Sequence, residues 1–434
     1  MSARILAVEL RRSNGPLAGA LVALAGFSGL YLLAATGQTA LWDGQWAMLA
    51  GYQRIMLVVL WPLAVGAGGW HAGRDRAART EELIGTTPRP RWRRVLPGSL
   101  VVAACLVAGY AAILAAGAGR VAARTSYVHA GWVPVALVGA LSLAAAGLLG
   151  AGVARLVPSR YTPAALLLAG FAAVVLPPEA LGWSGHGAAL LLLPEFLDDM
   201  DEFTAVAGRV SAGQAVWFGA LAVSGLALAT VARRRWAWVA AVPAVAGLVV
   251  ALAVLRPVAG SPLVPDARAG AEVCTHDGGP DVCVTRAHGK GLPALVEPAR
   301  RALRSLSVLP DAPTSVHEVV RPGTQPAAQA WLSVGNFDPA QDTDEITARI
   351  LAGAGTQFCP GSEHYRERAI VAAWLLRRYP APGFEVPPGH EAAARDLAWR
   401  TLRALPADEQ LQRIAAVRRA GLVCGDLTAA LGGR

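Results

Sequence analysis

Apolar residues in the first part of the chain lie in long, nearly unbroken runs rather than in stripes or at alternating positions. We count seven such runs, at 17–37, 55–71, 96–117, 132–154, 162–177, 214–232 and 237–255. Most have about 17 to 23 residues, the length that a helix needs to cross a bilayer core of about 30 Å. The pattern predicts a polytopic α-helical membrane domain with about seven transmembrane helices.

The pattern changes after Pro257, and no later apolar run is long enough to cross a bilayer. Short segments within 271–287 predict two strands around a turn, and further strands are predicted at 315–320 and 330–334. Helical patterns occur at 292–306 and near 343–353, 362–379, 389–405 and 407–420. We therefore divide the chain into a membrane domain, residues 1–257, and a small α+β domain, residues 258–434.

Composition and charge agree with this division. The chain is 54% hydrophobic and only 16% charged, which is too apolar for a single water-soluble core. Residues 1–257 hold 20 of the 39 basic residues but only 11 of the 30 acidic ones, so they carry the whole net charge of +9. A basic membrane part beside a neutral soluble part indicates a lipid bilayer, not nucleic acid, as the partner.

Arginines are distributed unevenly between the two sides of the predicted spans. With the N-terminus in the cytoplasm, fifteen arginines of the membrane domain lie on the cytoplasmic side. The outer loops and the stem hold five, namely Arg54, Arg120, Arg124, Arg209 and Arg256. The positive-inside rule therefore predicts a multi-pass plasma-membrane protein with a cytoplasmic N-terminus and an extracytoplasmic C-terminal domain.

Four of the five cysteines lie in the second domain. An even number confined to one domain is typical of disulfides formed in an oxidising compartment. The disulfide candidates are Cys274, Cys283, Cys359 and Cys424. If the first two pair across the predicted hairpin, the last two pair with each other, although the sequence alone leaves three connectivities open.

The alternative chemistry for the hairpin is a metal site formed by Cys274, His276, Cys283 and His288. Structural zinc sites usually pair ligands about two to four residues apart. The two cysteines here are nine residues apart. We therefore favour a disulfide, and we predict no metal site and no catalytic residue.

A further apolar stretch, residues 187–193, lies between the fifth and sixth predicted spans. It is too short to cross the bilayer, so we expect an interfacial or re-entrant helix. The acidic residues that follow could recruit a cationic solute, but a solvated outer face is the simpler interpretation. They are Glu195, Asp198, Asp199, Asp201 and Glu202.

The loop between the second and third predicted spans, residues 71–97, carries the most informative motif. Residues 74–85 predict a short helix along the inner surface. This helix contains Glu82-Leu83, and Thr87-Pro88 and an arginine cluster at 89–94 follow it. In this order of residues the chain resembles the membrane subunits of type-2 ABC exporters, over residues 1–232. The amphipathic start of the chain and the stretch at 187–193 are similar to the same family.

The resemblance implies a function for the loop at 72–94. In the family this segment is a coupling helix that docks on a separate ABC ATPase subunit. The residues that would make this contact here are Arg79, Glu81, Glu82, Leu83 and Thr87. The chain contains no GxxxxGK[ST] motif, so we expect it to be no enzyme, to hold no cofactor and to leave ATP to its partner.

The family also implies a homodimer or heterodimer of permease subunits. A seventh span and the second domain go beyond the family's six-helix pattern. A secondary transporter would instead place ionisable residues at mid-bilayer, and the seven predicted spans have none near their centres.

Another alternative is a membrane-anchored extracytoplasmic binding or sensor protein, for which seven spans are more than an anchor requires. The second domain faintly resembles the start of the zinc aminopeptidase catalytic domain. Where that family has HExxH, however, this chain has residues 347–352 without a histidine. The peptidase alternative is therefore a degenerate, non-catalytic domain.

Overall fold

The computed structural model describes residues 3–33, 42, 44–77, 90–181, 187–195, 200–231, 234–275, 277–320, 324–334, 342–359 and 364–432. The chain forms two compact units, Met1–Asp266 and Ala267–Arg434. Each unit has its own core and is described separately.

The boundary between the units lies beyond Pro257 because the segment after the last long helix remains attached to the first unit. Strand β2 (Leu263–Pro265) pairs antiparallel with β1 (Thr204–Val206). The hydroxyl of Tyr127 then donates a hydrogen bond to the carboxylate of Asp266 over 3.0 Å. These contacts extend the first unit past the point at which the apolar runs end.

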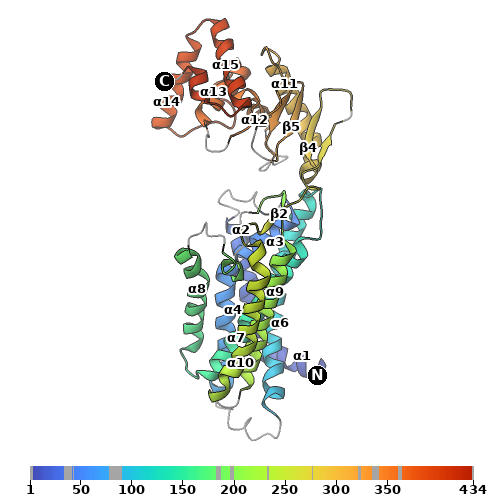
Figure 1. Cartoon of the computed structure of the whole chain (residues 1–434), viewed down its shortest axis with the longest axis vertical. Coiled ribbons are helices and arrows are strands. Elements are labelled where there is room, and N and C mark those ends of the chain that lie inside the picture. Colours follow the sequence, from blue (N-terminus) through green and yellow to red (C-terminus); the bar gives the residue numbers. More distant parts are fainter. Residues whose placement is uncertain are drawn as a thin grey trace. The chain divides into compact units, whose positions relative to one another are not determined.

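The first unit is a bundle of helices (Figure 1). Its α-helices are α1 (Ala3–Arg12), α2 (Gly15–Leu33), α3 (Trp46–Ile55), α4 (Leu57–Ala77), α6 (Arg91–Arg124), α7 (Trp132–Leu156), α8 (Thr162–Leu181), α9 (Gly208–Thr230) and α10 (Ala237–Leu255). Short 3-10 turns are η3 (Leu190–Leu192), η4 (Arg234–Trp236) and η5 (Arg256–Val258). Helix α7 is central, because α3, α4, α6 and α9 all pack against it.

Five described helices are long and apolar enough to cross a membrane, over Gly15–Leu32, Arg91–Arg124, Trp132–Leu156, Gly208–Thr230 and Ala237–Val258. Helices α3 and α4 together form a sixth candidate, bent by 55° at their junction. Helix α8 contributes a shorter apolar segment, Thr162–Pro178. By length and composition, the described part of the chain has the helices of a membrane protein, with five or six candidate spans.

Glycines let these helices approach one another closely. A Cβ atom on Gly68 of α4 would lie only 1.9 Å from the carbonyl oxygen of Gly147 on α7. A Cβ atom on Gly109 of α6 would lie 2.3 Å from the carbonyl oxygen of Gly19 on α2. Such contacts are typical of membrane helices, whose association depends on close packing because lipid removes the hydrophobic drive between helices.

One end of the bundle collects arginine side chains at the ends of successive helices. We define this arginine-rich end by Arg11, Arg12, Arg74, Arg91, Arg93, Arg94, Arg155, Arg160 and Arg235. Helix α1 and the start of α10 lie there (Figure 1). Arg74 Nη1 donates to the Arg12 carbonyl oxygen over 2.6 Å, and Arg91 Nη1 donates to that of Val231 over 2.9 Å.

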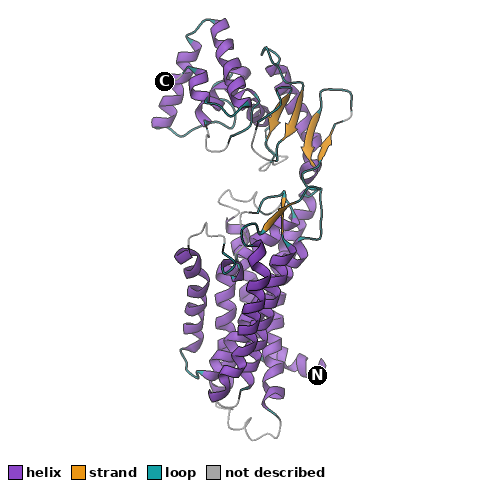
Figure 2. Cartoon of the chain, viewed as in Figure 1, coloured by secondary structure: helices purple, strands orange, loops and turns teal. Residues whose placement is uncertain are grey.

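The second unit contains a four-stranded sheet with helices beside it (Figure 2). The strands follow the order β3 (Glu272–Cys274), β4 (Val282–Thr285), β5 (Ser315–Glu318) and β6 (Gln329–Leu332), and only the β3–β4 pair is antiparallel. The helices are α11 (Leu292–Leu306), α12 (Thr343–Leu351), α13 (Tyr365–Leu376), α14 (His390–Arg403), α15 (Ala407–Leu422) and α16 (Leu427–Leu431). Two 3-10 segments are η6 (Arg286–Gly291) and η7 (Ala352–Ala354).

The period of two along β5 decides which side chains enter the core of the second unit. Val316 and Glu318 are buried, whereas Ser315 and His317 are half-buried. Because successive side chains of a strand point to opposite faces, His317 lies on the face away from Val316. The core proper is formed by apolar side chains of the sheet and of the helices, among them Val284, Leu295 and Ile370.

Candidate functional site

The residues predicted to contact an ATPase lie outside the described residues. They are Arg79, Glu81, Glu82, Leu83 and Thr87. The structure describes both flanks of this segment, since α4 ends at Ala77 and α6 begins at Arg91. Both flanks lie at the arginine-rich end of the first unit.

The four cysteines of the second unit form two disulfides, Cys274–Cys283 and Cys359–Cys424. The prediction of disulfides in this domain is therefore confirmed. The first disulfide joins paired positions of β3 and β4. The second joins the segment before α13 to the segment after α15.

The candidate metal ligands of the hairpin are used otherwise. The sulfur atoms of Cys274 and Cys283 are bonded to each other, so neither is a thiolate, although Glu272 lies beside them. His288 Nδ1 lies 2.6 Å from Glu318 Oε1. The fourth candidate, His276, lies outside the described residues. The described residues therefore favour a disulfide-bonded hairpin over a metal site.

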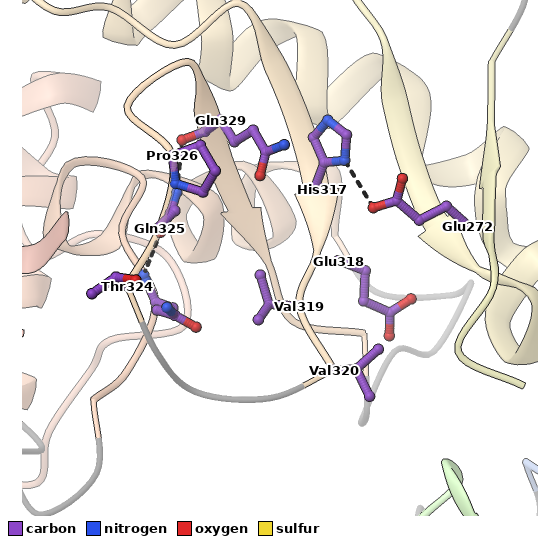
Figure 3. A pocket seen from close by; sticks show the side chains of 10 residues that line it. Glu272, His317, Glu318, Val319, Val320, Thr324, Gln325, Pro326 and Gln329 are labelled. Carbon is purple, nitrogen blue, oxygen red and sulfur yellow. Dashed lines mark hydrogen bonds and ion pairs between the residues drawn. The ribbon is translucent and has the colours of Figure 1, made fainter. Parts of the chain in front are cut away.

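An open pocket of about 250 Å³ lies beside the sheet of the second unit (Figure 3). Its lining comes from strand β3, from β5 and the residues after it, from the start of β6 and from the loop after η7. The lining residues are Glu272, His317, Glu318, Val319, Val320, Thr324, Gln325, Pro326, Gln329 and Gln357. Described lining residues offer imidazole, carboxylate and amide groups but no serine, cysteine or lysine nucleophile.

Several polar groups of this pocket are hydrogen-bonded to one another or to residues beside it. His317 points toward Glu272 (Figure 3), and its Nδ1 lies 3.1 Å from Glu272 Oε1, while its Nε2 lies 3.1 Å from Ser315 Oγ. Gln325 Nε2 donates to the Gly355 carbonyl oxygen over 3.0 Å, and its Oε1 accepts from the Gln357 N–H over 3.1 Å. These groups could orient a small polar molecule by hydrogen bonds.

Arg418 donates hydrogen bonds to loops near this pocket. Its Nε donates to the Asp311 carbonyl oxygen, Nη1 to that of Ala354 and Nη2 to that of Ala327, over 3.1, 2.7 and 2.6 Å. Burial lowers the pKa of Arg418 to about 10. All three nitrogens thus donate to backbone oxygens, which makes Arg418 part of the architecture of the second unit.

Residues 347–352, which stand where the aminopeptidase family has HExxH, form the end of α12 and the start of η7. Thr347 is fully buried, and its hydroxyl donates to the Thr343 carbonyl oxygen over 2.7 Å. A hydroxyl committed to its own helix in this way is not a metal ligand.

The first unit holds a polar site that the hydropathy pattern missed. Arg54, which the sequence places in an outer loop, belongs to α3 and is only 1% exposed. Arg54 thus lies in a helix and not in a loop, and its side chain bonds to Val135 of α7 and Gln214 of α9. The bent pair of α3 and α4 therefore carries a buried charge within a candidate span.

Arg54 is held by three elements that are distant in sequence. Its Nε donates to the Pro194 carbonyl oxygen over 2.6 Å, its Nη1 to that of Val135 over 3.4 Å, and its Nη2 to Gln214 Oε1 over 3.2 Å. The amide of Gln214 in turn donates from Nε2 to the Leu191 carbonyl oxygen over 2.8 Å. Two buried side chains thus fasten the segment 187–195 to the bundle.

The surroundings of Arg54 contain buried polar atoms without partners. They include Tyr110 Oη, Gln53 Oε1 and Glu195 Oε2. Burial raises the pKa of Glu195, which lies outside the spanning helices, to about 7, although the positive charge of Arg54 opposes this shift. Among described residues, no carboxylate oxygen lies within 4.0 Å of the Arg54 guanidinium. We call Gln53, Arg54, Tyr110, Glu195 and Gln214 the buried polar centre.

A local signal for this centre exists in the sequence. Gln53-Arg54 is flanked on both sides by apolar residues, Trp46–Gly51 and Ile55–Trp61, so a window that spans both flanks would have included it. The contacts themselves have no local signal, because Arg54 meets residues 81, 140 and 160 positions away.

Comparison with known proteins identifies no relative: no family model, no curated protein and no solved structure matches the chain.

Proposed function

We propose that the chain is the membrane subunit of an ATP-binding-cassette exporter, which forms the translocation pathway and is driven by a separate ATPase. The observation that carries the proposal is the arginine-rich end. Helix α1 precedes the first candidate span there, and Arg74 of α4 bonds to the last residue of α1. In sequence, the segment with Glu82-Leu83 and Thr87-Pro88 follows α4 and precedes α6, whose described ends lie at the same end.

Two further features support the same proposal. The segment 187–195 lies against α9 through the bond from Gln214 to the Leu191 carbonyl oxygen, as a re-entrant segment before the sixth span would. The chain contains no phosphate-binding loop of its own, so ATP-driven work requires a partner. Two permease subunits, identical or different, would then form the pathway.

The proposed topology has seven spans, with α3 and α4 as one span and the shorter α8 as another. The N-terminus lies in the cytoplasm, which places the arginine-rich end on the cytoplasmic face of the plasma membrane. The second unit is then extracytoplasmic, where its two disulfides persist. Its role in the exporter would be to hold or release the transported solute.

Variants of Glu82 test the proposal. The tagged chain, purified in mild detergent from membranes of its own host, should carry ATPase activity. Glu82→Arg should abolish this activity at unchanged membrane abundance, because it reverses a charge at the docking surface. The matched control is Glu385→Arg, an exposed glutamate of the second unit, which should retain the activity. A wild-type preparation without ATPase activity would contradict the proposal.

The pocket of the second unit favours a second candidate, an extracytoplasmic binding protein anchored by the helices. His317 and Glu272 would orient a small polar ligand there. Residues 267–434, expressed alone under oxidising conditions, can be screened for ligands by thermal shift. A ligand whose stabilisation is lost in His317→Ala would support this candidate, and failure of a broad polar library to shift the melting temperature would count against it.

A further inference from the structure

One corner of the arginine-rich end exposes arginine and tryptophan side chains together. The first turn of α6 contributes Arg91, Trp92 and Arg93, and the segment from η4 into α10 contributes Arg235, Trp236 and Trp238. All six side chains are exposed, and the three tryptophans are 49%, 51% and 66% exposed in chain order. We call these six residues the arginine–tryptophan corner.

The two segments of this corner are neighbours in the fold although they are distant in sequence. Arg91 Nη1 donates to the Val231 carbonyl oxygen over 2.9 Å, across 140 positions of the chain. Arg235 follows Val231 by four residues, so the Cα atoms of these two residues are at most about 14 Å apart. The start of α6 and the start of α10 therefore belong to one region of the surface.

The fold does not neutralise the arginines of the corner. Helix α6 has no acidic residue in its first turn, and the positive end of the helix dipole disfavours arginine there. Among described residues, no carboxylate oxygen lies within 4.0 Å of the guanidinium of Arg91, Arg93 or Arg235. Their positive charges are therefore available to an anion that is not part of the fold.

The tryptophans indicate that this anion belongs to a bilayer and is not dissolved in water. The rings of Trp236 and Trp238 stack with centroids 6.5 Å apart, and the Arg93 guanidinium lies 5.0 Å from the centroid of the Trp92 ring. The apolar candidate span Ala237–Val258 begins beside them. Exposed tryptophans at the end of a span are typical of the headgroup level of a membrane, where lipid phosphates lie.

We propose that the arginine–tryptophan corner binds the phosphate group of an anionic phospholipid of the surrounding bilayer. Guanidinium groups donate paired hydrogen bonds to phosphate oxygens, and basic clusters at the ends of membrane helices attract anionic lipids. A zwitterionic lipid carries a cationic group beside its phosphate, so the corner should prefer the anionic lipid. The inference requires only that the helices span a membrane, and it goes beyond the proposed export function.

The test uses the full-length chain in detergent, with dioleoyl phosphatidylglycerol as the probe and native mass spectrometry as the readout. Wild type should bind this lipid about tenfold more tightly than dioleoyl phosphatidylcholine. The double variant Arg93→Gln/Arg235→Gln should lose this preference. Its melting temperature should be unchanged, because both side chains are exposed.

A matched control separates this corner from the overall charge of the chain. The double variant Arg209→Gln/Arg256→Gln removes the same charge from two exposed arginines at the opposite ends of α9 and α10. It should keep the preference of wild type. An equal loss in both double variants would overturn the proposal, as would a preference that survives Arg93→Gln/Arg235→Gln or is absent from wild type.

A protein is the other partner that an exposed arginine surface could bind, here the ATPase of the proposed exporter. The variant Arg93→Gln/Arg235→Gln, purified in mild detergent from membranes of its own host, should keep the ATPase activity that wild type carries. Loss of that activity with an unchanged lipid preference would assign the corner to the protein partner and overturn the proposal. Lipid binding is measured without ATP or a partner, so a chain that prefers phosphatidylglycerol but carries no ATPase activity would retain this site and lose the exporter.

Discussion

The two units of this protein both bury arginine, and they use it differently. In the second unit, Arg418 donates from all three guanidinium nitrogens to backbone carbonyl oxygens of nearby loops. In the first unit, Arg54 makes one bond from each nitrogen and lies beside unpaired polar atoms. Arg418 therefore belongs to the architecture of its unit, whereas Arg54 lies in a polar centre in which several buried atoms have no hydrogen-bond partner.

The units also differ in what holds them together. Helices of the first unit meet at glycines, where backbone lies against backbone. The second unit has a core of apolar side chains and two disulfides. The first unit should therefore be sensitive to small increases in side-chain volume, and the second to the loss of cross-links and buried contacts.

The largest expected effect concerns the contact between α4 and α7. Gly68→Ala should prevent close packing of these helices, because the new methyl group would overlap the Gly147 carbonyl oxygen. The yield of monodisperse protein in size-exclusion chromatography should fall severalfold. Gly73→Ala on the same helix is the control, since open space surrounds that position. Equal yields would show that glycine packing does not hold this unit.

The disulfides of the second unit should differ in strength. Loss of Cys359–Cys424, which closes a separation of 65 residues, should cost about 4 kcal/mol of unfolding free energy. Loss of Cys274–Cys283, with a separation of 9, should cost about 2.5 kcal/mol. Paired cysteine-to-serine variants and denaturant unfolding measure both. A larger loss of unfolding free energy without Cys274–Cys283 than without Cys359–Cys424 would contradict this account of how the disulfides stabilise the second unit.

The variant Arg418→Gln tests whether Arg418 stabilises the second unit. It should destabilise the second unit by about 3 kcal/mol, because several buried carbonyl oxygens lose their donor. Denaturant unfolding of the second unit measures the loss. An unchanged free energy of unfolding would contradict this role of Arg418.

The smallest expected effect is a pH dependence that arises from Glu195. Its pKa is raised to about 7 in the folded chain, so the protonated form stabilises the fold. This contribution should be complete below about pH 4.5 and should disappear as the pH rises through about 7. Thermal unfolding of the full chain should show Glu195→Gln equal to wild type near pH 5 and more stable at pH 8. Parallel pH profiles would show that Glu195 is not buried as described.

Sequence patterns predicted much of this fold because its strongest signals are local. The apolar runs correspond to α2, α4, α6, α7, α8, α9 and α10, and the amphipathic period of α11 predicted its bounds, Leu292–Leu306. The pairing of Cys274 with Cys283 followed from their positions on two adjacent arms. In each case the relevant residues are close together in the chain.

The buried polar centre could not be predicted in the same way. Its residues come from α3, α6, α9 and the segment 187–195, which only the tertiary fold brings together. Pairing of β2 with β1 is equally non-local, and it moved the boundary of the first unit beyond Pro257. The residues predicted to contact the ATPase lie outside the described part of the chain, so their role stays a prediction.

The central claim, that a partner ATPase drives this membrane unit from its arginine-rich end, is tested most directly by site-specific photo-crosslinking. A photoreactive amino acid in place of Glu82, activated in native membranes, should form an adduct with an ATP-binding protein. The same amino acid in place of Glu385 should form none. An adduct from position 82 that contains no ATP-binding protein, or no adduct at all, would contradict the account.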